Sequence, residues 1–119
     1  MSTVKTHKDL DIWQRGIRLV EQIYKVTKRF PEGELYGLTS QMRRSSVSYP
    51  SNIAEGAARS SKKEFIHFLY VSLGSLSEVE TQLIIAEKLK FLNANKLLEE
   101  VEALRRMTLN FIKYLKSKK

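Results

Sequence analysis

The sequence contains no cysteine among its 119 residues and no long apolar segment. The lack of cysteine excludes disulfides, thiolate metal ligands and cysteine nucleophiles, and it is typical of a protein kept in a reducing cytoplasm. No apolar run approaches the roughly 20 residues that a membrane-spanning helix needs, and the polar first residues lack the apolar centre of a signal peptide. We therefore expect a cytoplasmic protein without membrane contact.

The chain is also poor in motifs for catalysis or cofactor binding. It has two histidines, His7 and His67, no glycine-rich phosphate loop and no zinc-type ligand spacing. The segment Glu64-Phe65-Ile66-His67 matches the Glu-x-x-His unit of di-iron bundles, but such sites use two of these units and only one is present. We expect no enzymatic activity, no metal, no cofactor and no small-molecule substrate, and we keep a di-iron oxidase only as a third alternative.

The sequence does have a globular composition, with 42% hydrophobic and 29% charged residues and no low-complexity tract or internal repeat. A chain of this length buries enough surface to fold without disulfides or metals. We therefore predict a single domain over residues 1–119.

Apolar residues recur at spacings of three and four, which predicts helices. The first is expected at approximately 10–30, where Pro31 disfavours helical geometry at the residue before it. The second is expected at 40–59, capped by the hydroxyl of Thr39. Pro50 predicts a kink or a break in this second helix, because proline removes an amide donor and crowds the preceding turn.

The third helix is expected at 62–90 and is the longest of the four. Ser61 and Glu64 form a capping-box pattern at its start, and Gly74 inside it predicts a close approach of another backbone. The fourth is expected at 94–116, after an Asn93 cap. Because short connections join antiparallel neighbours, the fold class is all-α, an antiparallel up-down four-helix bundle.

The basic charge is concentrated in the two terminal segments. The net charge is +8, and residues 1–30 and 96–119 each carry seven Lys or Arg against three Asp or Glu. Residues 31–60 have three of each sign, and residues 61–95 have four of each. Such an excess favours polyanionic partners, including nucleic acid.

Basic side chains on the first and fourth helices are the candidate nucleic-acid-binding residues. In an up-down bundle these helices are neighbours, so the two groups are expected to merge into one positive surface. The alternative is an ordinary solvated face, and salt dependence of binding distinguishes the two. No aromatic platform accompanies these cations, because the aromatic residues fall mostly on core rows. The candidates are Arg15, Arg18, Lys25, Arg29, Arg105, Arg106, Lys113 and Lys116.

A second polar feature runs down the second helix. Its residues are short and hydrogen-bonding where a solvent face usually carries lysine and glutamate. Such a row suits a buried network between helices or a subunit interface. Nearby Arg43 and Arg44 are expected to pair with Glu78 or Glu80. The row consists of Gln41, Ser45, Ser48, Asn52, Glu55 and Arg59.

Several short motifs resemble one known family. They are Trp13-Gln14, Phe30-Pro31, Glu34-Leu35-Tyr36-Gly37-Leu38, Gln41-Met42-Arg43-Arg44, Ser46-Val47-Ser48 with Pro50, and Ser51-Asn52-Ile53-Ala54-Glu55-Gly56. From Leu10 to Leu115 the chain is similar to the four-helix bundle proteins encoded in 23S rRNA intervening sequences. Tyr49 departs from the pattern, since the family more often has an aliphatic residue there.

The resemblance implies a ring-like homopentamer, similar to the accessory variability protein of diversity-generating retroelements, which is basic and works with nucleic acid and a reverse transcriptase. From residues and resemblance together we expect a non-enzymatic, oligomeric accessory protein that binds structured RNA or DNA with little sequence specificity. The alternative is a homo-oligomeric scaffold that docks an acidic protein partner and has no nucleic-acid role.

Overall fold

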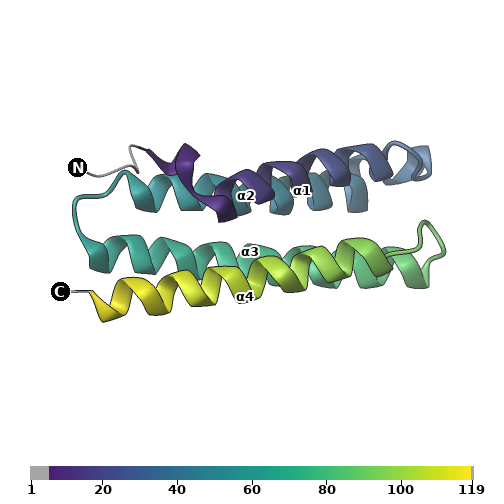
Figure 1. Cartoon of the computed structure of the whole chain (residues 1–119). Coiled ribbons are helices and arrows are strands. Elements are labelled where there is room, and N and C mark those ends of the chain that lie inside the picture. The colour runs from purple at the N-terminus through teal and green to yellow at the C-terminus, as the bar shows by residue number, and fades with distance from the viewer. Residues whose placement is uncertain (1–5, 119) are drawn as a thin grey trace.

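The computed structural model describes residues 6–118, which form an all-α antiparallel four-helix bundle, as the periodicity predicts. Helices α1 and α2 lie in one layer and α3 and α4 in the other (Figure 1). The four long helices are α1 (Asp11–Thr27), α2 (Ser40–Ala57), α3 (Lys62–Lys88) and α4 (Asn95–Ser117). Three short helical segments accompany them, η1 (His7–Asp9), η2 (Glu32–Glu34) and η3 (Leu35–Thr39).

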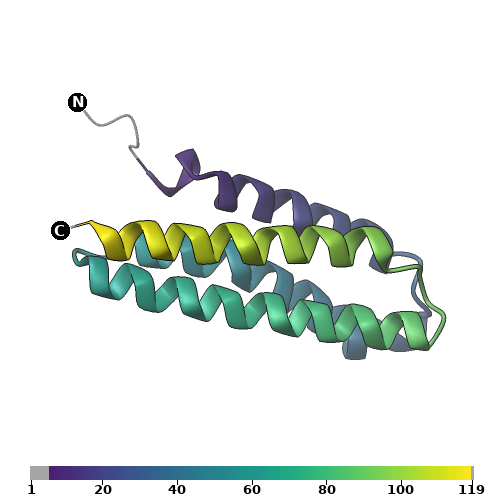
Figure 2. The same ribbon diagram turned by 60° about the horizontal axis from the view of Figure 1, so that its bottom comes forward.

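The bundle is elongated, with extents of 49 × 21 × 20 Å. The start of α1, the α2–α3 connection and the end of α4 lie at one end, which we call the terminal end (Figures 1 and 2). The α1–α2 and α3–α4 connections lie at the opposite end. Helices α2 and α3 make the most extensive contact, and α1 and α4 the least among neighbouring helices.

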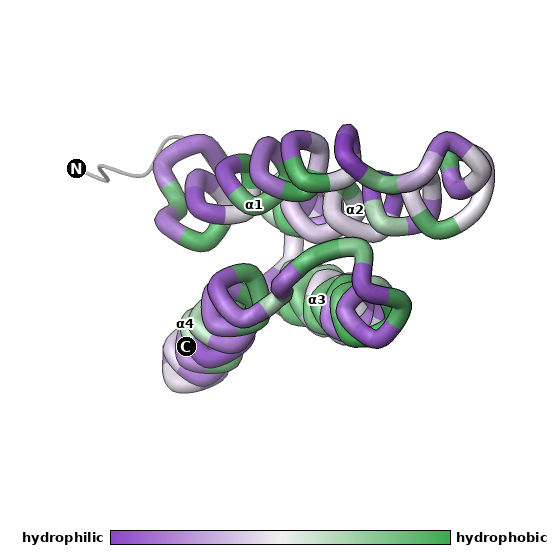
Figure 3. The backbone as a smooth tube through the Cα atoms, turned by 90° about the vertical axis from the view of Figure 1, so that its right-hand side faces the viewer, coloured by the Kyte–Doolittle hydropathy of each residue, from purple (hydrophilic) through white to green (hydrophobic). Residues whose placement is uncertain are grey.

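Each long helix turns its predicted apolar row into the space between the two layers. Figure 3 shows these layers from one end of the bundle, with hydrophobic residues recurring along every helix. Removing this apolar surface from water is the main force that holds the helices together. Fully buried examples from the four helices are Leu19, Ile23, Ile53, Leu76, Leu83 and Leu104.

Three predicted details of the helix starts need correction. The Thr39 hydroxyl does not cap α2, because η3 continues directly into this helix and the Ser40 amide bonds to Gly37 O. Ser61 Oγ does accept the Glu64 amide at 3.1 Å, but Glu64 Oε1 accepts from the Ser61 hydroxyl instead of from its amide. Ala94 occupies the N-cap position of α4, while Asn93 Oδ1 accepts from the amide of Asn95, the first residue of the helix, at 3.0 Å.

The interiors of α2 and α3 also differ from prediction. Helix α2 is not broken at Pro50, since the element continues from Ser40 to Ala57, and a bend at this proline stays a prediction. The predicted close approach at Gly74 is wrong, because a Cβ there would meet no heavy atom within 4 Å. The close approaches are at Gly16 and Gly56 instead. A Cβ added at Gly16 would lie 2.8 Å from Tyr49 atoms, and one added at Gly56 would lie 2.8 Å from an atom of Phe68.

The connection from α3 to α4 contains a backbone conformation that suits glycine. Lys90 has φ 67°, the left-handed region, and its amide bonds to Glu87 O while the Phe91 amide bonds to Ala86 O. These two bonds form a Schellman motif, in which the left-handed position is usually glycine.

We therefore expect Lys90→Gly to raise the free energy of unfolding by about 1 kcal/mol, because glycine has no Cβ to clash in this conformation. Urea denaturation checks this value. As a matched control, Lys88→Gly lies within α3 and should lower stability by about 1 kcal/mol. Equal changes in the free energy of unfolding for Lys90→Gly and Lys88→Gly would contradict the assignment of Lys90 as the left-handed residue of a Schellman motif.

Candidate nucleic-acid interface

Three of the predicted cations on or just after α1 face solvent. Arg18 and Lys25 are exposed on α1, and Arg29 is exposed just past its end. Among residues 6–118, none of these three side chains makes an ion pair. Their charges are therefore available to an external anion. The predicted helix reaches 30, whereas α1 ends at Thr27, so Arg29 extends the charged face beyond the helix itself.

Arg15 has a different role, because it joins α1 to α4. Its Nε and Nη2 atoms donate to the two carboxylate oxygens of Glu100 at 3.1 and 2.7 Å, and Nη1 lies 3.1 Å from Met107 Sδ. The hydrogen bonds to Glu100 raise the pKa of Arg15, so its charge is fixed. A bidentate pair of this kind orients two helices and leaves little of the guanidinium for a phosphate.

Two of the four helix-four cations contact α3 and not α1. Arg105 contacts Glu102 and lies 3.9 Å from Glu80 of α3, and Lys116 donates to the Tyr70 hydroxyl of α3 at 3.2 Å. The side of α4 that meets α1 carries Glu100 and Met107. Arg105 and Lys116 therefore lie at the contact with α3, and a single surface shared with the α1 cations stays a prediction.

Arg106 and Lys113 differ in their surroundings. Arg106 is exposed but lies 3.9 Å from Glu102, and it lines a surface hollow that also contains Glu99. Lys113 is exposed and makes no ion pair with another described residue. Of the four predicted cations on α4, Lys113 and Lys116 are thus the two whose charges no carboxylate of the described residues offsets, and Lys116 is held at Tyr70.

The polar row of α2 lies along the seam with α3. Ser45 Oγ is 2.5 Å from Gln82 Oε1, and Ser48 Oγ is 2.8 Å from Ser75 Oγ. Asn52 Nδ2 donates back to Ser48 O at 2.9 Å. These contacts give the central part of the row partners within one chain, as buried polar groups require.

The ends of this row are exposed. Gln41 is in solvent at the start of α2, while Arg59 donates to Glu55 at 2.7 Å on the surface. The predicted pairing of Arg43 and Arg44 with α3 carboxylates is not found among the described residues. Arg43 Nε instead donates to Thr27 Oγ1 at 2.9 Å, and its guanidinium lies over the Tyr24 ring.

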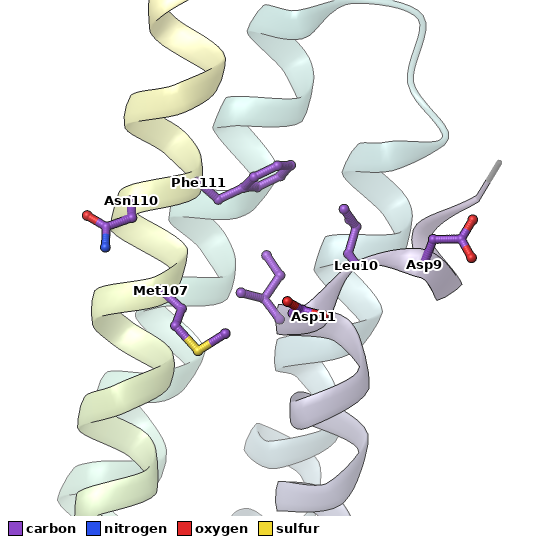
Figure 4. A pocket seen from close by; sticks show the side chains of 7 residues that line it. Asp9, Leu10, Asp11, Met107, Asn110 and Phe111 are labelled. Carbon is purple, nitrogen blue, oxygen red and sulfur yellow. The ribbon is translucent and has the colours of Figure 1, made fainter. Parts of the chain in front are cut away.

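A cleft of about 450 Å³ opens between the start of α1 and the middle of α4 (Figure 4). Apolar side chains from both helices line it, with two carboxylates and an amide beside them. The acidic groups make this cleft a poor place for a phosphate, and no nucleophile and base meet there. The lining residues are Asp9, Leu10, Asp11, Ile12, Met107, Asn110 and Phe111.

The Glu-x-x-His segment has ordinary structural contacts. Glu64 interacts with Ser61 and lies 3.8 Å from Arg59, and the His67 ring packs edge-on to Phe68. His7 is not at a frayed end, since it lies in η1 with its ring 5.1 Å from Trp13. Within residues 6–118 no group of three or more potential ligands is placed to hold a metal ion. Over the same residues, no helix has the length and apolar character to cross a membrane.

Tyr49 places a polar hydroxyl inside the hydrophobic core. In the sequence this residue is distinguished only by its departure from the pattern of the 23S rRNA intervening sequence family. Its ring is fully buried, and its hydroxyl lies 2.8 Å from Thr108 Oγ1, which in turn donates to Leu104 O at 2.7 Å. Tyr49 is therefore the donor to Thr108. Burial raises the pKa of Tyr49 to about 12 because the phenolate cannot be solvated there.

Fold and surface together define an antiparallel four-helix bundle with exposed cations on its first helix. The chain belongs to the 23S rRNA-intervening sequence protein family, whose model matches residues 8–110. No curated protein matches it. Its fold is similar to the crystal structure of a protein with unknown function from the S23 ribosomal protein family of Bacteroides thetaiotaomicron VPI-5482. The two share 19% identity with a TM-score of 0.76, covering 86% of this chain and 98% of that one.

Proposed function

We propose that this protein is a non-enzymatic accessory protein that binds structured RNA or DNA through the solvent-facing cations of α1. One observation carries the proposal: Arg18, Lys25 and Arg29 are exposed on or next to a single helix and none is offset by a carboxylate. Lys113 of α4 is likewise exposed and makes no ion pair with another described residue. These four residues replace the larger predicted set, because Arg15, Arg105 and Arg106 have acidic partners and Lys116 donates to the Tyr70 hydroxyl of α3.

The spacing of these cations suits a phosphate backbone. A helix rises about 1.5 Å per residue, so Arg18 and Lys25 are separated by about 10 Å along α1. Side chains of this length can therefore reach separate phosphates of one strand. Contacts to phosphates position a nucleic acid but carry no sequence information, so binding is expected to be weakly sequence-specific.

The proposal includes self-assembly. The resemblance to ring-forming relatives favours a homopentamer, in which the α1 cations of several copies act on one nucleic acid and raise its apparent affinity. Light scattering gives the oligomeric state, and a monomer at working concentration removes this part of the proposal.

The test is charge reversal on α1. In Arg18→Glu/Lys25→Glu, two phosphate contacts are lost, so the affinity for an RNA hairpin should fall at least tenfold at low salt. Because each contact contributes about −0.9 to the slope of log K against log salt, the slope should become shallower by about 2. Fluorescence anisotropy over a salt series measures both quantities.

The matched control is Arg44→Glu/Lys88→Glu, which makes the same change in net charge on α2 and α3. This variant should retain most of the affinity and the wild-type slope. If both double variants lose affinity equally, binding depends only on the net positive charge of the protein, and the assignment of the binding site to α1 is wrong. If wild-type protein binds neither RNA nor DNA at low salt, the scaffold for an acidic protein partner becomes the better explanation.

A further inference from the structure

Three lysines and two exposed tyrosines lie toward the terminal end of the bundle. Lys62, the first residue of α3, donates through Nζ to the backbone oxygen of Lys118, just beyond α4. This contact joins the two helices where α4 ends (Figure 2). The set that we call the aromatic-basic end consists of Lys62, Tyr70, Tyr114, Lys116 and Lys118.

Each tyrosine is paired with one lysine. Lys116 Nζ lies 3.2 Å from the Tyr70 hydroxyl and 5.4 Å from its ring centre. Lys118 Nζ lies 2.9 Å from the Tyr114 hydroxyl and 5.0 Å from its ring centre. The two rings remain 46% and 52% exposed. The prediction that aromatic residues fall mostly on core rows is wrong for these tyrosines.

Among residues 6–118, no carboxylate pairs with these lysines. Their amines interact with neutral hydroxyls or a backbone carbonyl, which leave the positive charge in place. Glu64, two residues after Lys62, lies 3.8 Å from Arg59. The aromatic-basic end is therefore cationic and also presents the faces of two aromatic rings.

Packing beneath the surface holds the Tyr114 ring in place. Phe111 stacks on Tyr114 with ring centres 6.2 Å apart and planes 17° apart, and Phe65 packs edge-on against Phe111 at 5.6 Å. A ring fixed in this way loses little side-chain entropy when a flat ligand stacks on it.

We propose that the aromatic-basic end binds unpaired nucleotides, with Lys116 and Lys118 at phosphates and Tyr70 and Tyr114 stacking on bases. Lysine with an exposed aromatic ring is the combination that single-strand binding surfaces use, because every base has a face to stack. A duplex hides its base faces, so this end selects single-stranded segments or loops. The inference rests on the proposed function but assigns it a second site, separate from the α1 cations.

The experiment compares tyrosine variants on two labelled probes, an oligouridylate of about 12 nucleotides and a fully paired RNA duplex. Tyr70→Leu and Tyr114→Leu should each weaken oligouridylate binding by about tenfold, the loss expected for one stacked base. Binding of the duplex should change by less than about twofold. Tyr70→Phe and Tyr114→Phe keep the rings and should bind the oligouridylate almost as wild type does.

Tyr36→Leu is the matched control, because Tyr36 is 93% exposed at the opposite end and lies in η3. It should leave both affinities unchanged. If the leucine variants at the aromatic-basic end bind oligouridylate like wild type while the duplex still binds, the inference is overturned and the proposed function stands. If wild-type protein binds neither probe, both fail.

Discussion

Raising the pH from about 9 to about 12 is expected to lower the free energy of unfolding by about 2 kcal/mol through Tyr49 alone. In the folded protein this hydroxyl keeps its proton up to a pKa of about 12, whereas a tyrosine of the unfolded chain ionises with a pKa of about 10. Between these values the unfolded chain binds fewer protons than the folded one. Stability is therefore fully present below pH 10 and is lost as the pH rises toward 12. Urea denaturation at a series of alkaline pH values measures the loss.

Tyr49→Phe isolates this effect from the titration of lysines and of the exposed tyrosines. At neutral pH the variant should be about 1 kcal/mol less stable, because the hydrogen bond to Thr108 is lost. Above pH 10 its stability should fall less steeply than that of wild type, and the two curves should cross. Parallel curves for the two proteins would show that Tyr49 ionises normally in the folded state.

Adding one methyl group at Gly16 is expected to destabilise the bundle, whereas the same change at Gly74 is expected to stabilise it. A Cβ at Gly16 would lie 2.8 Å from Tyr49 Cδ2 and Cε2, and the buried ring has no free space to move into. Such overpacking costs about 1–3 kcal/mol and outweighs the gain of about 1 kcal/mol in helix propensity. At Gly74 an added Cβ would meet no heavy atom within 4 Å, so only the gain in helix propensity remains. Thermal unfolding of Gly16→Ala and Gly74→Ala measures both effects.

A second substitution identifies the cause of the Gly16 effect. If the clash is with the tyrosine ring, Gly16→Ala should cost less in a Tyr49→Leu background than in wild type, because the smaller side chain vacates the space. Additive effects of the two substitutions would contradict a direct contact. The pair also explains why an aromatic residue fits at position 49, since the glycine opposite makes room for its ring.

The helices could be predicted from the sequence because burial imposes a periodic pattern on each of them. Gly16 lies at a spacing of three or four from the buried Ile12 and Leu19, so the sequence does carry a signal for its contact with a neighbouring helix. Gly74 lies on the exposed side of α3, and an interior position in a helix does not by itself predict a close approach. The cap of α2 was missed for another reason. A π-helical segment, η3, precedes Ser40, and no local motif indicates it.

The candidate site was predicted less well, since charge pairing depends on how helices dock. Arg15 and Arg18 are three residues apart and look equivalent in the sequence, yet only Arg15 meets Glu100, 85 positions away. The aromatic-basic end had a local signal in Tyr114 and Lys118, which are four residues apart at the end of α4. Its other part, Tyr70 with Lys116, is brought together only by the antiparallel contact of α3 and α4.

The bond between Arg15 and Glu100 has a consequence for the order in which the bundle is completed. On the ribosome α1, α2 and α3 are synthesised before α4, so Arg15 has no carboxylate partner at that stage. The Tyr49 hydroxyl likewise has no partner until Thr108 of α4 is in place. Both contacts therefore require α4 to be synthesised and docked, and the three-helix segment made before it leaves exposed the hydrophobic residues that α4 covers.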